Sequence, residues 1–133
     1  MDSTVVRTAA NFNNPMRFCY RPINSPYPSL LNSISLTGSP SLILDTVKRG
    51  EDDEDVSRGE FAKREGKSVI LRVYDSLGGK NRGTIKTTLP VKRAWKTNVL
   101  EDDLDEVKVE KGEIKIELRP FEVATFRLQL QLR

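Results

Sequence analysis

The stretch Val69-Ile70-Leu71-Arg72-Val73-Tyr74 decides the fold class, because it carries the most concentrated strand signal in the sequence. β-Branched and aromatic side chains are enriched in β-strands. The residues that follow, Asp75-Ser76-Leu77-Gly78-Gly79, are those that favour a tight turn. We therefore expect a short strand ending in a turn to be the unit that repeats along this chain.

The same unit recurs on both sides of this strand. Upstream, Ser33-Ile34-Ser35-Leu36 alternates polar with apolar residues, and a second strand begins at Leu42. Downstream, Arg82–Thr88 and Val91–Val99 are predicted to be extended. Short strands at close spacing, with turns between them, favour a β-sandwich or a barrel.

The last third of the chain alternates most regularly. Ile114, Ile116 and Leu118 are separated by charged residues, which is the period-two pattern of a half-buried strand. After Pro120 a second alternation places one set of residues on each face of a strand. The apolar set is Ala124, Phe126, Leu128, Leu130 and Leu132, and the polar set is Thr125, Arg127, Gln129 and Gln131.

The sequence thus predicts an all-β protein, most simply a β-sandwich over residues 33–133. Residues 1–32 form a partly irregular lead-in segment, in which Val5–Ala10 and Met16–Tyr20 are the plausible short strands. No segment shows sustained helical periodicity.

The composition excludes several classes of partner. Lysine and arginine alternate with acidic residues at a net charge of +3, so no nucleic acid is expected. No apolar run approaches the roughly 20 residues that span a bilayer, so no membrane is expected. Met1–Ala10 lacks the apolar core of a signal peptide, and the single Cys19 suits a reducing compartment.

The chain contains no histidine. Histidine is the commonest proton-transfer group near neutral pH and a common zinc ligand. No Ser-His or Cys-His pair and no ordinary zinc site can therefore be built within this chain, although a glycosidase-type pair of carboxylates stays possible. We assign no catalytic residue and no metal ligand.

One charged segment is the candidate functional patch: Lys48, Arg49, Glu51, Asp52 and Asp53, at the start of a connection that runs to residue 67. Such side chains hydrogen-bond sugar hydroxyls or pair across a domain interface. We favour interface or structural work over sugar contact, within a solvated connection between two strands.

Three further features have simpler interpretations. The acidic cluster at 101–103 with Asp105 and Glu106 has the oxygens of a calcium site but not its spacing, which favours a solvated turn. Trp95 is predicted in the core rather than stacked on a sugar, and Phe121 is predicted to be buried at a bend. The turn at 78–81 lacks the glycine spacing of a phosphate loop.

Five segments in order resemble the C-terminal region of family 38 glycoside hydrolases, the α-mannosidases, most closely of the cytosolic or vacuolar type. They are 40–53 (PSLILDTVKRGEDD), 69–79 (VILRVYDSLGG), 88–91 (TLPV), 98–102 (NVLED) and 116–125 (IELRPFEVAT). Residues 5–16 are similar to the family's lead-in to this region.

The resemblance implies a retaining glycosidase that removes terminal α-linked mannose, with an aspartate nucleophile beside zinc or another divalent metal. In the family these groups lie in an N-terminal catalytic domain that this chain lacks, so the chain alone is expected to be inactive. The implied role is a C-terminal β-sandwich, with strands upstream of Met1 missing, that supports the catalytic domain in cis in the cytoplasm or vacuole. The segment 48–53 would face that domain, and contact with oligosaccharide stays possible.

Two alternatives belong to other classes of protein. A free-standing carbohydrate-binding module would bind mannose without hydrolysing it. A β protein-interaction domain would use exposed edge strands.

Overall fold

The computed structural model describes residues 4–13, 33–59 and 62–131. Within these ranges, eight strands confirm the all-β prediction. They are β1 (Ile34–Gly38), β2 (Leu42–Arg49), β3 (Ser68–Asp75), β4 (Asn81–Thr87), β5 (Val91–Thr97), β6 (Asp103–Val107), β7 (Glu113–Leu118) and β8 (Val123–Leu130).

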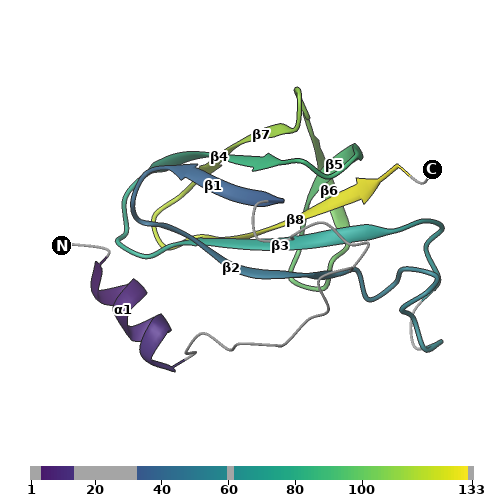
Figure 1. Cartoon of the computed structure of the whole chain (residues 1–133), viewed down its shortest axis with the longest axis horizontal. Helices are drawn as coiled ribbons and strands as arrows, with labels where there is room; N and C mark the ends of the chain where they lie inside the picture. Colours follow the sequence, from purple (N-terminus) through teal and green to yellow (C-terminus); the bar gives the residue numbers. More distant parts are fainter. Residues whose placement is uncertain (1–3, 14–32, 60–61, 132–133) are drawn as a thin grey trace, which may run out of the picture.

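The strands form two antiparallel sheets that pack face to face, as the predicted sandwich requires. The smaller sheet has the order β1-β4-β7, and the larger has the order β2-β3-β8-β5-β6. Figure 1 shows β1, β4 and β7 as the upper layer and β2 and β3 in the lower one. Strand β8 is the central strand of the larger sheet, since it pairs with β3 on one side and β5 on the other.

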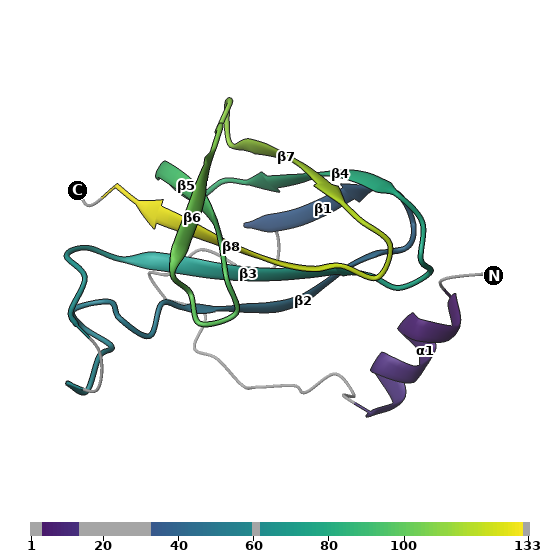
Figure 2. The ribbon, with the colours of Figure 1, turned by 180° about the vertical axis from the view of Figure 1, so that it is seen from behind.

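Two connections differ from all the others between consecutive strands. The β2–β3 and β5–β6 connections join neighbours within the larger sheet, whereas every other connection crosses from one sheet to the other. Figure 2 shows β5 and β6 running steeply across the direction of β2 and β3, because the larger sheet is strongly twisted. This twist brings the two within-sheet connections toward each other.

The core lies between the sheets and follows the predicted alternation. Leu71 and Val73 of β3, Ile114 of β7, and Phe126 and Leu128 of β8 are all buried in one apolar cluster. The outer face of the smaller sheet is charged, with ion pairs such as Lys86–Glu113 across β4 and β7. One face of the smaller sheet is therefore apolar and the other solvated, as expected for an antiparallel sheet.

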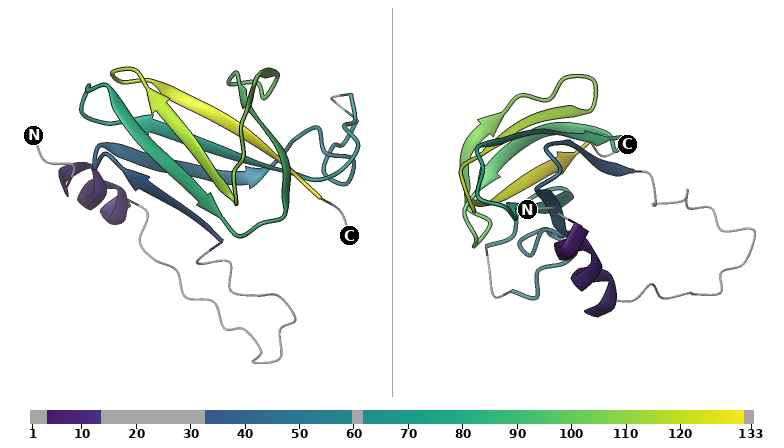
Figure 3. Two further views of the ribbon diagram at one scale, coloured as in Figure 1. Left: turned by 90° about the horizontal axis from the view of Figure 1, so that it is seen from above. Right: turned by 90° about the vertical axis from the view of Figure 1, so that its left-hand side faces the viewer.

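The prediction of a strand at Val5–Ala10 was wrong, because Thr4–Asn13 forms the helix α1. Val5, Ala9 and Phe12 recur at the spacing that places residues on one helix face, and the alanines favour a helix. Figure 3 shows α1 beside the sandwich, and none of its side chains is buried. Met16–Tyr20 and Cys19 lie outside the described residues, and the boundary at residue 32 stays a prediction.

No helix among the described residues is long and apolar enough to cross a bilayer.

Two aromatic residues lie where the sequence did not predict. Ala94, not Trp95, faces the core from β5, because successive residues of a strand point to opposite faces. Trp95 is half-buried on the outer face, with the Arg93 guanidinium 4.9 Å from its ring centroid. Phe121 is 68% exposed and its backbone has a φ of 58°, so the turn directs its ring outward and over Gly78.

The two phenylalanines of this segment provide a matched test of the core. We expect Phe126→Ala to lower the free energy of unfolding by about 3–5 kcal/mol, because it leaves a cavity between the sheets. Phe121→Ala should cost less than about 1 kcal/mol, since most of that ring is already in water. Urea unfolding followed by tryptophan fluorescence measures both. Equal losses would contradict the assigned core.

Candidate functional site

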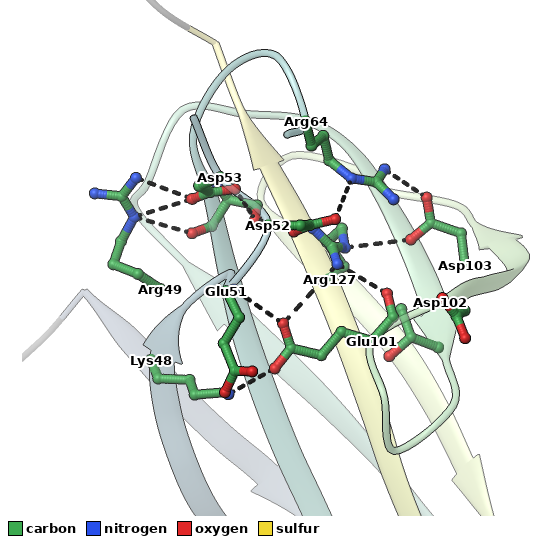
Figure 4. Close-up of polar contacts among 12 residues, drawn as sticks. Lys48, Arg49, Glu51, Asp52, Asp53, Arg64, Glu101, Asp102, Asp103 and Arg127 are labelled. Atoms are coloured by element: carbon green, nitrogen blue, oxygen red, sulfur yellow. Dashed lines mark hydrogen bonds and ion pairs between the residues drawn. The ribbon is translucent and has the colours of Figure 1, made fainter. Parts of the chain in front are cut away.

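Arg127 is the centre of the candidate site. It lies on β8 between Phe126 and Leu128, which face the core. Its side chain therefore projects from the outer face of the larger sheet, away from the core. Its ladder partners are Ile70 on β3 and Trp95 on β5. The side chain is only 1% exposed, because the β2–β3 and β5–β6 connections fold over this face (Figure 4).

The guanidinium of Arg127 is surrounded by acceptors from both connections. Nη1 donates to Asp52 Oδ1 at 2.6 Å and to Ser68 Oγ at 3.3 Å. Nη2 donates to the carbonyl oxygen of Glu101 at 2.8 Å, and Nε lies 3.2 Å from Asp103 Oδ1. A buried charge is costly unless it is paired, so these acceptors are what permit an arginine at this position.

Asp53 ties the β2–β3 connection to the beginning of β3. Its carboxylate is fully buried and accepts hydrogen bonds from the backbone nitrogen of Ser68 at 2.8 Å and from Ser68 Oγ at 2.6 Å. Arg49 at the end of β2 donates to the same carboxylate from Nη2 at 2.9 Å. The connection is therefore held at both of its ends.

Glu101 joins the two connections to each other. Its side chain is 6% exposed, accepts from the backbone nitrogen of Glu51 at 3.2 Å and pairs with Lys48 Nζ at 2.6 Å. Lys48 also donates to the Glu51 carboxylate. The backbone of Glu101 has a φ of 70°, which is uncommon for a residue other than glycine.

Arg64 also joins the two connections to each other. It donates to Asp52 at 3.0 Å and to Asp103 at 2.7 Å, and so spans the two connections on the side away from the sheet. We call the whole set the Arg127 cluster. Its members are Lys48, Arg49, Glu51, Asp52, Asp53, Arg64, Ser68, Glu101, Asp103 and Arg127.

Gly50 shows how tightly the cluster packs. A Cβ atom at this position would lie 2.3 Å from Ser68 Oγ and 3.2 Å from Arg127 Nη1. Only a residue without a side chain leaves room for the guanidinium beneath the β2–β3 connection.

The electrostatics favour ionised carboxylates. Burial alone would raise the pKa of Asp52, but hydrogen bonds from Arg127 and Arg64 outweigh this effect and hold the pKa below its usual value. Asp52 is therefore charged at neutral pH and is a poor candidate for a proton donor.

The structure brings together all five residues of the predicted patch, Lys48, Arg49, Glu51, Asp52 and Asp53. The prediction of a solvated connection was wrong for its first part, since Lys48 and Arg49 end β2 and Asp53 is buried. The solvated turn predicted at 101–103 was also wrong, because Glu101 is buried and Asp103 pairs with two arginines. Burial on the sheet explains both errors.

Arg127 and Arg64 were not predicted as members of the site. The available signal for Arg127 was a single arginine between two large apolar residues in the most regularly alternating strand. Its strand proved to be central, with a connection available on each side to cover it. Arg64 carried no comparable signal in the sequence.

The side chains of the cluster and of the space beside it define what this surface offers to a ligand. Within the described residues, no group of three or more His, Cys, Asp or Glu side chains is arranged to hold a metal ion. A hollow beside the cluster is lined, among the described residues, by polar groups together with the aliphatic side chains of Ala62 and Leu100. The polar lining consists of Glu51, Asp52, Lys63, Arg64, Glu101 and Asp102.

Comparison with known proteins places this geometry in context. Residues 41–126 match the family described as the glycosyl hydrolases family 38 C-terminal beta sandwich domain. The chain is 36% identical over 140 residues to an alpha-mannosidase of Saccharomyces cerevisiae, covering 96% of this chain and 12% of the relative. It is 27% identical over 132 residues to alpha-mannosidase 2C1 of Homo sapiens, covering 98% of this chain and 12% of the relative.

A third relative is alpha-mannosidase G of Dictyostelium discoideum, 26% identical over 129 residues, with 94% of this chain and 11% of the relative covered. The chain thus corresponds to a small part of each of these relatives.

Removing the central charge should destabilise the fold strongly. We expect Arg127→Met to lower the free energy of unfolding by about 3–5 kcal/mol, because it leaves carboxylates buried without their partner. Arg93→Met is the matched control: Arg93 lies on the neighbouring strand, pairs with Glu106 in solvent and contacts the ring of Trp95, so its loss should cost no more than about 1 kcal/mol. Urea denaturation measures the free energy of unfolding of both variants. Equal effects would contradict a buried ionic centre.

The lowered pKa of Asp52 gives a test with a defined sign. The unfolded state binds a proton at higher pH than the folded state does, so this carboxylate contributes stability above its unfolded pKa of about 3.9, and the contribution is lost as pH falls through the folded value. We expect Asp52→Asn to be less stable than the wild type at pH 7 and the difference to shrink below about pH 4. Denaturation at a series of pH values measures it. A difference independent of pH would contradict the pairing.

Proposed function

The chain belongs to the glycosyl hydrolase family 38 C-terminal β-sandwich domains, and we propose that it is a non-catalytic domain of an α-mannosidase that hydrolyses terminal α-D-mannose residues in oligosaccharides. The family match over residues 41–126 supports the membership in such an enzyme. The single observation that carries a supporting role is that the carboxylates of the Arg127 cluster are committed to cations of the same chain: the three aspartates pair with arginines, and the two glutamates pair with Lys48.

Glycosidase chemistry requires something different from two carboxyl groups. One must hold a proton at the leaving group, and both must face the sugar. Asp52 and Asp103 instead face the guanidinium groups of Arg127 and Arg64, and the lowered pKa of Asp52 opposes the role of general acid. These carboxylates serve the shape of the domain rather than the cleavage of a bond.

The divalent metal that the family resemblance implies, most simply zinc, does not fit the described residues. A cation placed among Asp52, Glu101 and Asp103 would lie against the guanidinium of Arg127, and like charges repel. We assign the metal, with the aspartate nucleophile, to a separate catalytic domain of the enzyme.

That catalytic domain is the partner we propose, joined in cis as part of one longer protein. Lys48, Arg49, Glu51 and Asp52 are then interface residues, because the surface they build is held in one shape by the Arg127 cluster, while the buried Asp53 supports that surface from within the domain. A substrate oligosaccharide would reach this surface only at the edge of the enzyme's cleft. By the same resemblance we propose that the enzyme works in the cytoplasm or the vacuole.

A chimera tests this proposal directly. We would replace the matched segment of the Saccharomyces cerevisiae relative by this chain, and assay release of an aryl group from an aryl α-mannoside in the presence of zinc. We expect the chimera to be active and the isolated chain to be inactive. The relative with its matched segment deleted is the control, which should lose activity because its substrate cleft loses support.

The outcomes separate the possible functions. Turnover by the isolated chain would contradict a non-catalytic role. An inactive chimera would contradict the role of a supporting domain. Heat released when mannose is titrated into the isolated chain would instead favour a carbohydrate-binding module, and concentration-dependent self-association would favour a β protein-interaction domain.

A further inference from the structure

The β5–β6 turn exposes two large apolar residues side by side in the sequence. Val99 is 68% exposed and Leu100 is 78% exposed. Single exposed apolar side chains are common on protein surfaces, but an adjacent pair at the tip of a turn needs a further explanation. The next residue, Glu101, is by contrast buried.

The backbone of this turn is fixed rather than loose. The side-chain oxygen of Asn98 accepts from the backbone nitrogen of Asp102 at 2.9 Å, and the backbone nitrogen of Asn98 donates to the carbonyl of Asp102 at 3.0 Å. Glu101 donates from its backbone nitrogen to the carbonyl of Asn98 at 3.1 Å. The two exposed side chains therefore project from a closed, hydrogen-bonded turn.

The Arg127 cluster anchors the turn to the sheet. Arg127 binds the carbonyl of Glu101, while Lys48 and the backbone of Glu51 bind its carboxylate. Figure 4 shows this buried attachment. The φ of 70° at Glu101 is a strained conformation, and such strain persists only where surrounding contacts enforce it. The contacts that bury Glu101 thus also hold its two apolar neighbours out in water.

The charge around the pair indicates the chemistry of its partner. Asp102, near the pair in the sequence, is exposed; among the described residues its carboxylate forms no ion pair and accepts a hydrogen bond from the neutral amide of Asn98. Leu100 borders a hollow of mixed charge, which Glu51, Asp52, Lys63 and Arg64 also line. A surface that covers Val99 and Leu100 should therefore combine an apolar pocket with a lysine or arginine side chain at the part of its rim that faces Asp102.

We propose that Val99 and Leu100 form the apolar anchor by which this domain docks on the catalytic part of the same α-mannosidase, in an apolar pocket with a basic rim. The inference rests on the proposed function. It is supported by the size of the relatives, of which this chain covers 12%, so that most of the enzyme is available to cover the turn. Apolar side chains that leave water on docking contribute to the interface through the area that they bury.

The chimera described above provides the test, with the double variant Val99→Asp and Leu100→Asp. Thermal inactivation of the aryl α-mannosidase activity is measured, together with urea unfolding of the isolated chain. We expect the double variant to shorten the half-life of the chimera about tenfold or more, because two carboxylates would enter an apolar pocket. The urea midpoint of the isolated chain should not change, since both side chains are already in water.

Val123→Asp is the matched control. Val123 is 60% exposed at the start of β8 and is not part of the Arg127 cluster. This variant makes the same chemical change as Val99→Asp and should leave the half-life of the chimera unchanged. Asp102→Asn, which keeps an acceptor oxygen for Asn98, should shorten the half-life to a smaller extent by removing a charge that faces the basic rim.

Each outcome decides between the proposals. An inactive chimera with the wild-type sequence overturns the proposed function, and this inference with it. An active chimera whose half-life is unaffected by the double variant, or affected equally by Val123→Asp, overturns this inference alone. An equal loss of stability in the isolated chain, or self-association of the chain that the double variant abolishes, also overturns it.

Discussion

The structure depends on one buried charge, the guanidinium of Arg127. The side chain of a residue in the middle of the central strand projects from one of the two faces of the sheet. Phe126 and Leu128 project into the core, so the side chain of Arg127, between them, projects from the outer face. An arginine there is tolerated only if acceptors surround it, and these come from two connections that are distant in sequence. Because Arg127 needs these acceptors, the two connections must fold over the outer face of the larger sheet.

The topology explains why these two connections meet. Both join neighbouring strands within the larger sheet, so they stay on its edges and can fold over its outer face. Asp53 fixes the first connection to β3, and Glu101 fixes the second to the first. The result is a rigid polar surface with exposed apolar residues at its edge. Such a surface suits the role proposed for this β-sandwich domain, the support of another part of an enzyme.

Local pattern was sufficient to predict much of the fold. β-Branched and aromatic residues predicted the strand around Val73. Period-two alternation predicted the strands around Ile116 and Phe126, because burial on one face imposes it. The helix at Thr4–Asn13 was not predicted, because helical periodicity over only ten residues is a weak signal in a chain whose other segments indicate strands. The segment 48–53 was correctly predicted to form one charged patch. Its packing against the buried Arg127 was not predicted, because Arg127 lies 75 positions from Asp52 in the sequence. Long-range pairing of charges leaves no periodic trace in a sequence.

The most direct test of the central claim is amide hydrogen exchange of the unmodified chain. If the Arg127 cluster orders the outer face, the amides of Glu51, Arg64 and Ser68, which donate to groups within these connections, open with free energies close to those of β3 and β8. Exchange of Glu51 and Arg64 at the rates of an open loop, while the strands stay protected, would show that the connections are not held. The buried charge would then not be the organising feature of this domain.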